Sequence, residues 1–571
     1  MKKKYMTKTK TFFKPKVFGM PKPVWTLIRW VFVLSGAALT LTATLRGSAL
    51  AGLAGVAVSA VVCGWLVFRT KILEETVRGF SVLNGLIALP YAAAAARIFM
   101  AYFYFRFEKL SDTAFVFLSA RSGAGAELFI RMLPGLKTAL TVFIGLALWL
   151  AAYWMIGGIR RRGLPFLRGL NGTEIAFILA GAAVSMALIF IVYTRTNLFY
   201  LPLQDGQIVN YDAVFTADSG VLTQTNVFVN INAAENDLRH PLFGLFAMPL
   251  GITASWIAFL FKSQPLAYPL ALAFLQALAL LFSMIMVSRL AGAGHVDQIF
   301  FLLLYFISYP SLLFILTVEQ YIVALFWLSL CLYFLCRPGP DGDGWREISY
   351  SGAAGTLLTS GFFILFSPGG KGLKGYALSV LRSGLGFLAF AAVFGQLPQF
   401  VNAVQTVKNL SRFAGYGLPF GEKLCQYLTF IPACLIAPAA GISRAGAYIS
   451  YQMLPVEDPG WIGVILLALA SAGFLLNLRS KFCRVCFSWL LFSFCLLALA
   501  GWGSLENGMI LYTLYFSWAL LSLIYAGLQK ALAKHTAVRL SLVSLGLLAV
   551  AAFNIRGLRE LIGFGISYYP R

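Results

Sequence analysis

Long apolar runs alternate along the chain with short loops that are mostly basic. A run of about 20 apolar residues forms a helix long enough to cross the hydrocarbon core of a bilayer, and many windows of the sequence satisfy this condition. Backbone N–H and C=O groups within lipid must form their hydrogen bonds inside the protein, so a chain can cross the bilayer only as helices or as a closed barrel. The runs are continuous and lack the two-residue alternation of barrel strands. The pattern therefore predicts an all-α polytopic membrane protein with roughly 13 transmembrane helices.

The expected spans form an N-terminal group and a longer second group. The first group comprises 25–45, 52–68, 80–104 and 139–156, and the second comprises 175–193, 265–287, 300–316, 321–335, 376–393, 461–476, 487–500, 510–526 and 540–552. Two further apolar stretches, 241–261 and 351–367, are expected to lie at the surface or to enter the membrane only part way. Pro249 and Gly251 interrupt the first stretch, and the second is short and rich in Gly, Ser and Thr.

Basic residues between the spans predict the orientation, because cytoplasmic loops carry an excess of Lys and Arg. Arg160–Arg162 gives the strongest such signal. On this basis residues 1–24 form a basic cytoplasmic tail that contacts anionic lipid, 25–172 form a four-span region, and 173–571 form the membrane core. The longest polar segments of the core, 194–240 and 396–459, then lie on the outer face, together with juxtamembrane or partial helices.

The composition supports the same class of protein. The chain has 571 residues, is 60% hydrophobic and 12% charged, and has a mean hydropathy of +0.81, which excludes a soluble globular protein. The net charge of +24 lies in the loops between spans, so we expect membrane lipids and no nucleic acid as partners. Cys483 and Cys486 have the spacing of metal ligands, but no second pair accompanies them, which argues against a zinc site.

The first outer segment holds the densest set of candidate functional residues. Taken singly, each is typical of a solvated loop, but a polar set pressed between apolar spans must be oriented by the protein. An acid at the membrane boundary is partly desolvated, which raises its pKa and suits it to take a proton from an alcohol. The acids are Asp205, Asp212, Asp218, Glu235 and Asp237, and the bases are Arg195, Arg239 and His240.

This arrangement resembles the membrane glycosyltransferases of the GT-C fold, which include the aminoarabinose transferase of lipid A and the protein O-mannosyltransferases. Typical members have an Asp near the start of the first outer loop and a His-Pro-Pro or His-Lys-Pro-Pro before the next apolar helix; here Asp218 and His240-Pro241-Leu242 stand at those places. Residues 308–321 resemble the second outer loop, which often carries an acid, and 352–360 resemble the Gly-rich partial helix. The resemblance extends from about Glu174 to the C-terminus.

The resemblance implies a GT-C-like fold and an inverting transfer of a sugar from a polyprenyl-phosphate donor to an acceptor glycan, lipid or protein on the outer face. Asp218 would be the base, with Asp212 as the second candidate and Glu319 as a further functional acid. The host membrane would be a bacterial plasma membrane. One proline follows His240 and no Asp-x-Asp is present, so a divalent cation, Mg²⁺ or Mn²⁺, stays an open candidate cofactor.

Further residues would contact the substrates. Arg239 and His240 would bind the phosphate of the donor or hold the loop, and His240 alternatively makes a single hydrogen bond at a helix start. Cations of the second outer segment would bind the leaving phosphate. The full set of predicted substrate-binding residues is Arg239, His240, Asp237, Arg412, Lys423 and Glu506, with Lys408 and Arg444 as additional cations of the second segment.

Two other functions fit the class of protein. A transporter or flippase of a lipid-linked solute would need charges within the spans or broken helices at mid-membrane. A polysaccharide polymerase or ligase would share the substrate class and would depend on basic residues of the late outer loop, here Arg412 and Arg444. No phosphate-binding loop or dinucleotide fingerprint stands between a strand and a helix, so no nucleotide-driven machinery is expected.

Overall fold

The computed structural model describes most of the chain and separates it into two compact units. The described residues are 22–44, 56–61, 63–64, 68, 80–200, 213–215, 217–230, 238–262, 264–292, 294–337, 345–366, 372–393, 396, 400, 418–445, 448–454, 460–503 and 508–571. One unit is Met1–Arg162 with Ala392–Leu397, and the other is Gly163–Ala391 with Pro398–Arg571. Each unit is considered by itself.

The first unit is built around a long helical hairpin, α4 (Val82–Ser119) and α5 (Gly123–Gly158), with α1 (Lys22–Thr44) packed on both. Each arm begins at a serine whose side chain accepts a hydrogen bond from a backbone N–H of the first turn, which satisfies a donor that the helix leaves unpaired. The shared core is small and consists of Ala88, Ala92, Ala152 and Tyr153.

Both arms of the hairpin run beyond the expected spans 80–104 and 139–156, through a stretch that carries Glu108, Asp112 and Glu127. Helix α4 has 38 residues and α5 has 36, and only a short turn separates them. At 1.5 Å per residue α4 is about 57 Å long, well beyond a bilayer core. Glu is a good helix former, so these acids change the polarity of the helix without ending it.

The second unit holds the rest of the helices and one β-hairpin. In chain order its elements are α6 (Leu164–Arg168), α7 (Gly172–Arg195), α8 (Ser219–Gln224), α9 (Phe243–Leu260), α10 (Ala267–Ala291), α11 (His295–Ile307), α12 (Tyr309–Leu316), α13 (Gln320–Cys336), α14 (Trp345–Thr356), the 3₁₀ helix η2 (Leu358–Phe366), α15 (Leu373–Val393), α18 (Phe420–Ala433), β1 (Ala440–Ala445), β2 (Tyr448–Met453), α19 (Trp461–Leu476), α20 (Lys481–Ser493), η4 (Phe494–Leu499), η5 (Gly508–Tyr512), α21 (Thr513–Ala531) and α22 (Thr536–Tyr568). A π-helix, η1 (Ile159–Gly163), precedes α6.

The helices identify a multi-pass α-helical membrane protein. Within the described ranges, 8 helices are long and apolar enough to cross a membrane, or up to 9 if α11 and α12, which meet at 55°, form one span. Three shorter apolar helices lie at Thr26–Ala37, Gln320–Cys336 and Trp461–Leu476. The larger count of roughly 13 stays a prediction.

The expected interruption at Pro249 and Gly251 is wrong, because α9 runs as one helix of 18 residues through both. Gly251 is a packing position: a Cβ added there would lie 2.6 Å from a side-chain carbon of Val229. In the second stretch, 351–367, α14 ends at Thr356 and gives way to the tighter η2; that this stretch crosses the membrane only part way stays a prediction.

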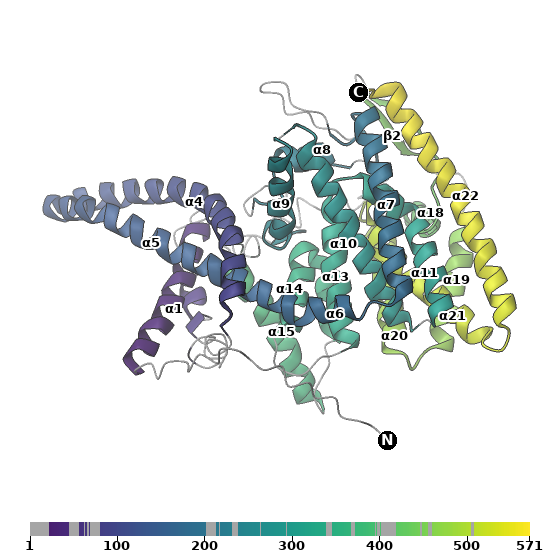
Figure 1. Ribbon diagram of the computed structural model, residues 1–571, viewed down its shortest axis with the longest axis horizontal. Helices are drawn as coiled ribbons and strands as arrows, with labels where there is room; N and C mark the ends of the chain where they lie inside the picture. The colour runs from purple at the N-terminus through teal and green to yellow at the C-terminus, as the bar shows by residue number, and fades with distance from the viewer. Residues whose placement is uncertain are drawn as a thin grey trace. The chain divides into compact units, whose positions relative to one another are not determined.

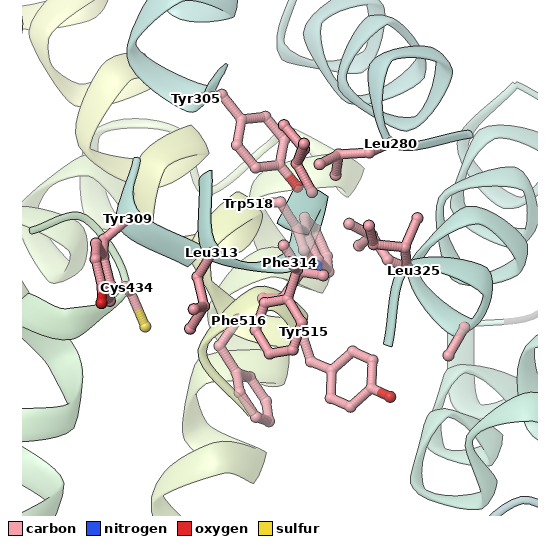
Figure 2. Close-up of a cluster of buried hydrophobic side chains, with 14 of the residues drawn as sticks. Leu280, Tyr305, Tyr309, Leu313, Phe314, Leu325, Cys434, Tyr515, Phe516 and Trp518 are labelled. Carbon is pink, nitrogen blue, oxygen red and sulfur yellow. The ribbon is translucent and has the colours of Figure 1, made fainter. Parts of the chain in front are cut away.

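Helix α10 lies at the centre of the second unit and contacts α7, α9, α11, α13 and α21 (Figure 1). It is apolar on all sides, as expected of a helix without a solvent face. Figure 2 shows the core beside it, where Leu280 of α10, Phe314 of α12 and Trp518 of α21 converge, and all three are fully buried.

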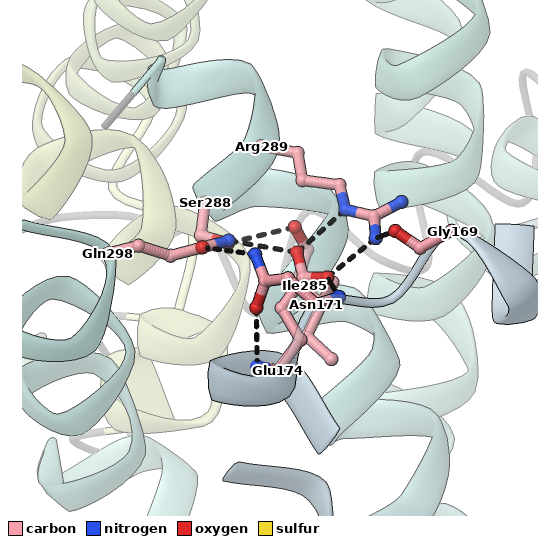
Figure 3. A network of polar contacts seen from close by, with 7 residues as sticks. All are labelled: Gly169, Asn171, Glu174, Ile285, Ser288, Arg289 and Gln298. Carbon is pink, nitrogen blue, oxygen red and sulfur yellow. Dashed lines mark hydrogen bonds and ion pairs between the residues drawn. The ribbon is translucent and has the colours of Figure 1, made fainter. Parts of the chain in front are cut away.

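A polar network ties together one end of this helix bundle (Figure 3). The guanidinium of Arg289, at the end of α10, donates to both oxygens of Glu174 at 2.7 and 2.6 Å, and Gln298 of α11 donates to Glu174 at 2.9 Å. Asn171 caps α7 and exchanges hydrogen bonds with Glu174 in a capping box. The side chain of Glu174 is 1% exposed and that of Arg289 is 15% exposed, so three helix ends are fixed by one buried ion pair.

Removing one partner of this pair should destabilise the protein. Arg289→Met leaves the Glu174 carboxylate buried without its counter-charge. Because the guanidinium is partly exposed, we expect a loss of about 3 kcal/mol, the lower end for a broken buried pair. Thermal unfolding in detergent measures it. The double variant Glu174→Gln, Arg289→Met should lose less than Arg289→Met alone, and an equal or larger loss would contradict a compensated pair.

The close contact of α19 with α21 should tolerate no side chain. A Cβ on Gly473 would lie 2.0 Å from the backbone oxygen of Leu523, whereas one on Gly546 of α22 would meet nothing within 4 Å. Gly473→Ala should therefore cost about 1–3 kcal/mol, as overpacking does, while the control Gly546→Ala should be neutral or stabilise by up to about 1 kcal/mol. Similar unfolding temperatures for the two variants would refute the contact.

Candidate functional site

The two polar segments of the core meet at the end of the unit opposite the Glu174 network. Phe215 donates its backbone N–H to the carbonyl of Tyr451 at 2.9 Å, and Tyr451 donates to the carbonyl of Ala213 at 2.8 Å. Tyr451 also pairs with Ile442 across the antiparallel β1–β2 hairpin. Residues of the segment 194–240 thus extend a sheet formed by the segment 396–459.

The β1–β2 hairpin is not expected from the sequence, which predicts an all-α chain, and the described chain is otherwise mainly helical. Helix α18 ends at Ala433, and β1 begins at Ala440. The sequence of β2, Tyr-Ile-Ser-Tyr-Gln-Met, is rich in aromatic and β-branched residues, which favour strands. Because β2 has only 6 residues, it carries little signal in the sequence beside the long apolar runs.

Phe215, three residues before Asp218, holds a strained backbone conformation. Its φ is 50°, a left-handed value that costs a bulky residue of order 1–3 kcal/mol. The side chain is fully buried and packs edge-on against Tyr309 and Tyr451. This packing keeps the strained turn in place and directs the chain towards Asp218.

Asp218 and Glu319, both predicted from the sequence, lie next to each other. Asp218 is exposed and precedes α8, while Glu319 lies between α12 and α13 and is 4% exposed. The backbone N–H of Asp218 donates to the Glu319 carboxylate, and the hydroxyl of Ser219 donates to Oε1 at 3.4 Å. The polar loop is thereby fixed to the break between two apolar helices.

The surroundings of Glu319 favour its neutral form. Burial raises its pKa well above the ordinary value, and the nearby charge of Asp218 raises it further. Hydrogen bonds from the backbone N–H groups of Asp218 and Gln320 and from Ser219 act in the opposite direction. Gln276 of α10 donates to the backbone carbonyl of Glu319, which holds the residue in position.

Two tyrosines that were not predicted, Tyr321 and Tyr515, lie near Glu319, and a third, Tyr512, packs on Tyr321. The ring of Tyr321 lies 5.3 Å from that of Tyr515 and 6.4 Å from that of Tyr512, and Glu319 acts electrostatically on both Tyr321 and Tyr515. Tyr321 follows the acid by two positions, a signal visible in the sequence. Tyr512 and Tyr515 come from a distant segment, and no local pattern marks them.

Arg239 lies at the edge of the same group. It is exposed, and it lies within electrostatic range of Tyr515. Its backbone carbonyl accepts from the N–H of Leu358 at 2.9 Å. The predicted cation is therefore placed by the break between α14 and η2.

His240 fixes the loop to this break. Its Nδ1 lies 2.6 Å from the carbonyl oxygen of Thr356, and the N–H of Leu242 donates to Gly355 at 2.7 Å. Since a carbonyl only accepts, Nδ1 carries the proton. A Cβ on Gly355 would lie 2.7 Å from that of Leu242, so the Gly-rich sequence permits the approach. The contact gives His240 a positioning role.

Of the other residues in the predicted catalytic and substrate-binding set, the structure describes Lys423. Lys423 lies half-buried in the first turn of α18. Asp212, Asp237, Arg412 and Glu506 lie outside the described residues. Among the residues that the structure places, no group of three His, Cys, Asp or Glu side chains could hold a metal ion.

Comparisons with known proteins give no relative from which a role could be transferred. No protein-family model, no curated protein and no solved structure matches the chain.

Glu319 should make the stability depend on pH. Its pKa is higher in the folded than in the unfolded chain, so the folded protein holds the proton more tightly, and this stabilisation is lost as the pH rises towards the folded pKa. Glu319→Gln has no such titration. From about pH 5 to about pH 8, the unfolding temperature of the wild type should fall relative to that of Glu319→Gln. A constant difference between the two would contradict the raised pKa.

Proposed function

We propose that the protein is an integral membrane glycosyltransferase that transfers a sugar from a polyprenyl-phosphate donor to a hydroxyl or amine acceptor on the outer face of the membrane. The observation that carries the proposal is the pairing of an exposed acid, Asp218, with a buried one, Glu319, where a polar loop meets the ends of apolar helices. In this proposal the acceptor reaches the exposed acid from the water, and the donor comes from the bilayer.

The two acids have different roles in this proposal. The Asp218 carboxylate accepts the proton of the acceptor as its oxygen or nitrogen attacks the anomeric carbon, and the bond from that carbon to the phosphate oxygen breaks. The phosphate leaves with the bonding electrons. Glu319 stays neutral, so a second carboxylate does not compete with Asp218 for the proton of the acceptor. The carboxyl group of Glu319 also accepts a hydrogen bond from the backbone N–H of Asp218, which keeps that residue in position.

Arg239 supplies the positive charge that the leaving phosphate requires. It lies on the exposed side of the group, and a guanidinium can bind two phosphate oxygens at once. His240 keeps the Arg239 segment against the α14–η2 break through the Thr356 carbonyl. The orientation, with the acid pair outside and the Glu174 end inside, follows the basic residues Arg289, Arg337 and Arg539 at that end.

Asp218→Asn should abolish most of the transfer. The amide keeps the shape of the side chain but cannot accept the proton, and loss of a general base lowers kcat about 10²–10⁴-fold. The measurement is the movement of label from radiolabelled polyprenyl-phosphate sugars to acceptors in a membrane extract, with purified protein.

Glu422→Gln, which neutralises an exposed acid on α18, is the matched control and should retain wild-type turnover. Equal turnover of Asp218→Asn and wild type would remove Asp218 from the role of base. Label in a growing polymer would instead favour the polymerase or ligase variant of the same substrate class.

A transporter of a lipid-linked solute is the second candidate, and the broken helices favour it. Helices α11 and α12 meet at 55°, α14 gives way to η2, and a buried acid follows the first break. Such breaks and acids are found at the binding sites of transporters. Movement of the lipid across reconstituted vesicles, without transfer of label to an acceptor, would favour this function.

A further inference from the structure

Three of the buried polar atoms that lack a hydrogen-bond partner belong to residues near Glu319. They are the hydroxyl of Tyr515, Nε2 of Gln320 and Oε1 of Gln276, and none has a hydrogen-bond partner among the described residues. The three residues are 1%, 6% and 0% exposed, in that order. Each unpaired buried polar atom costs about 1–3 kcal/mol, so several at one place require an explanation such as a bound ligand.

Each of these residues is tied to Glu319. Gln276 donates through Nε2 to the backbone carbonyl of Glu319, which leaves its carbonyl oxygen unpaired. Gln320 is the next residue and donates its backbone N–H to the carboxylate. Tyr515 lies within electrostatic range of Glu319, and in Figure 2 its hydroxyl points away from the apolar cluster of Phe314 and Trp518.

The chemistry of this group, here termed the Glu319 cluster (Gln276, Glu319, Gln320 and Tyr515), indicates the kind of ligand. It offers an amide donor, an amide acceptor, and a phenol that both donates and accepts. None of its four side chains is a cation, so a buried anionic group on the ligand would stay unpaired. The positive charge of Arg239 lies outside the cluster, on the exposed side.

We propose that the Glu319 cluster binds the hydroxyl groups of a neutral sugar ring, while the phosphate attached to that ring lies at Arg239. The inference rests on the proposed function and narrows it, because it assigns the sugar end of the donor to the buried cluster. It also narrows the sugar to an uncharged one, which excludes uronic acids.

The test uses Tyr515→Phe, which removes only the hydroxyl. Since that hydroxyl has no partner within the described structure, its loss should not destabilise the fold. Tyr305→Phe is the matched control: its hydroxyl is also buried, and it belongs to the same core (Figure 2) but not to the Glu319 cluster. Affinity is measured by calorimetry on the purified, full-length protein in nanodiscs.

The probes are glucosyl, mannosyl and galactosyl farnesyl phosphate, with farnesyl phosphate as the lipid without a sugar. The wild type should bind at least one glycosylated probe more tightly than farnesyl phosphate. Tyr515→Phe should weaken that binding about three- to tenfold, the effect of one neutral hydrogen bond, and leave farnesyl phosphate unchanged. Tyr305→Phe should match the wild type with every probe.

The outcomes separate this inference from the proposed function. Suppose that the wild type transfers label. If Tyr515→Phe then binds the glycosylated probes as tightly as the wild type does, or binds farnesyl phosphate more weakly to the same extent, the inference is overturned and the proposed function stays intact. Selective weakening in a protein that transfers no label would support the sugar site and overturn the transferase. If the wild type binds no glycosylated probe more tightly than farnesyl phosphate, the sugar site is refuted.

Discussion

The burial of Glu319 is the constraint on which the rest of the site depends. A carboxyl that is 4% exposed among apolar helices is costly as an anion unless it is paired with a cation. The described surroundings supply hydrogen-bond donors to this carboxyl, but they also place a second acid, Asp218, beside it. The neutral form resolves this conflict. It also requires the Asp218–Ser219 turn and Gln276 to stay where they are, because they position the carboxyl and its backbone. The acid therefore organises the loop, α10 and the start of α13 together.

Two supports hold the loop over this acid. On one side the strained turn at Phe215 is locked by Tyr309 and Tyr451 and by the ladder to β2. On the other side His240 and Leu242 are fixed to the end of α14. Both supports use backbone hydrogen bonds, which satisfy polar groups of irregular chain close to apolar helices. The Glu174–Arg289 pair fixes the opposite helix ends, so the bundle is tied at both ends.

The sequence was sufficient for the class of protein and for the two acids, but not for their environment. Apolar runs predict membrane helices because length and composition decide whether a helix can cross a bilayer. An acid that directly follows such a run, as Glu319 does, is easy to recognise in the sequence. Local pattern failed where distant packing decides: Pro249 and Gly251 looked like a break but lie inside α9, since Gly251 accommodates Val229. Tyr515 and Gln276 were missed for the same reason, because only folding brings them to Glu319. The β-hairpin was missed because two six-residue strands carry little signal among long helices.

The most direct test of this account is the infrared difference spectrum of the protonated carboxyl group, recorded on wild type and Glu319→Gln at neutral pH. The account predicts a protonated carboxyl band in the wild type that is absent from Glu319→Gln. Addition of a glycosylated farnesyl phosphate should shift this band, and farnesyl phosphate alone should not. If the band is missing at neutral pH, or persists unchanged in Glu319→Gln, then Glu319 is not the neutral acid around which the site is built.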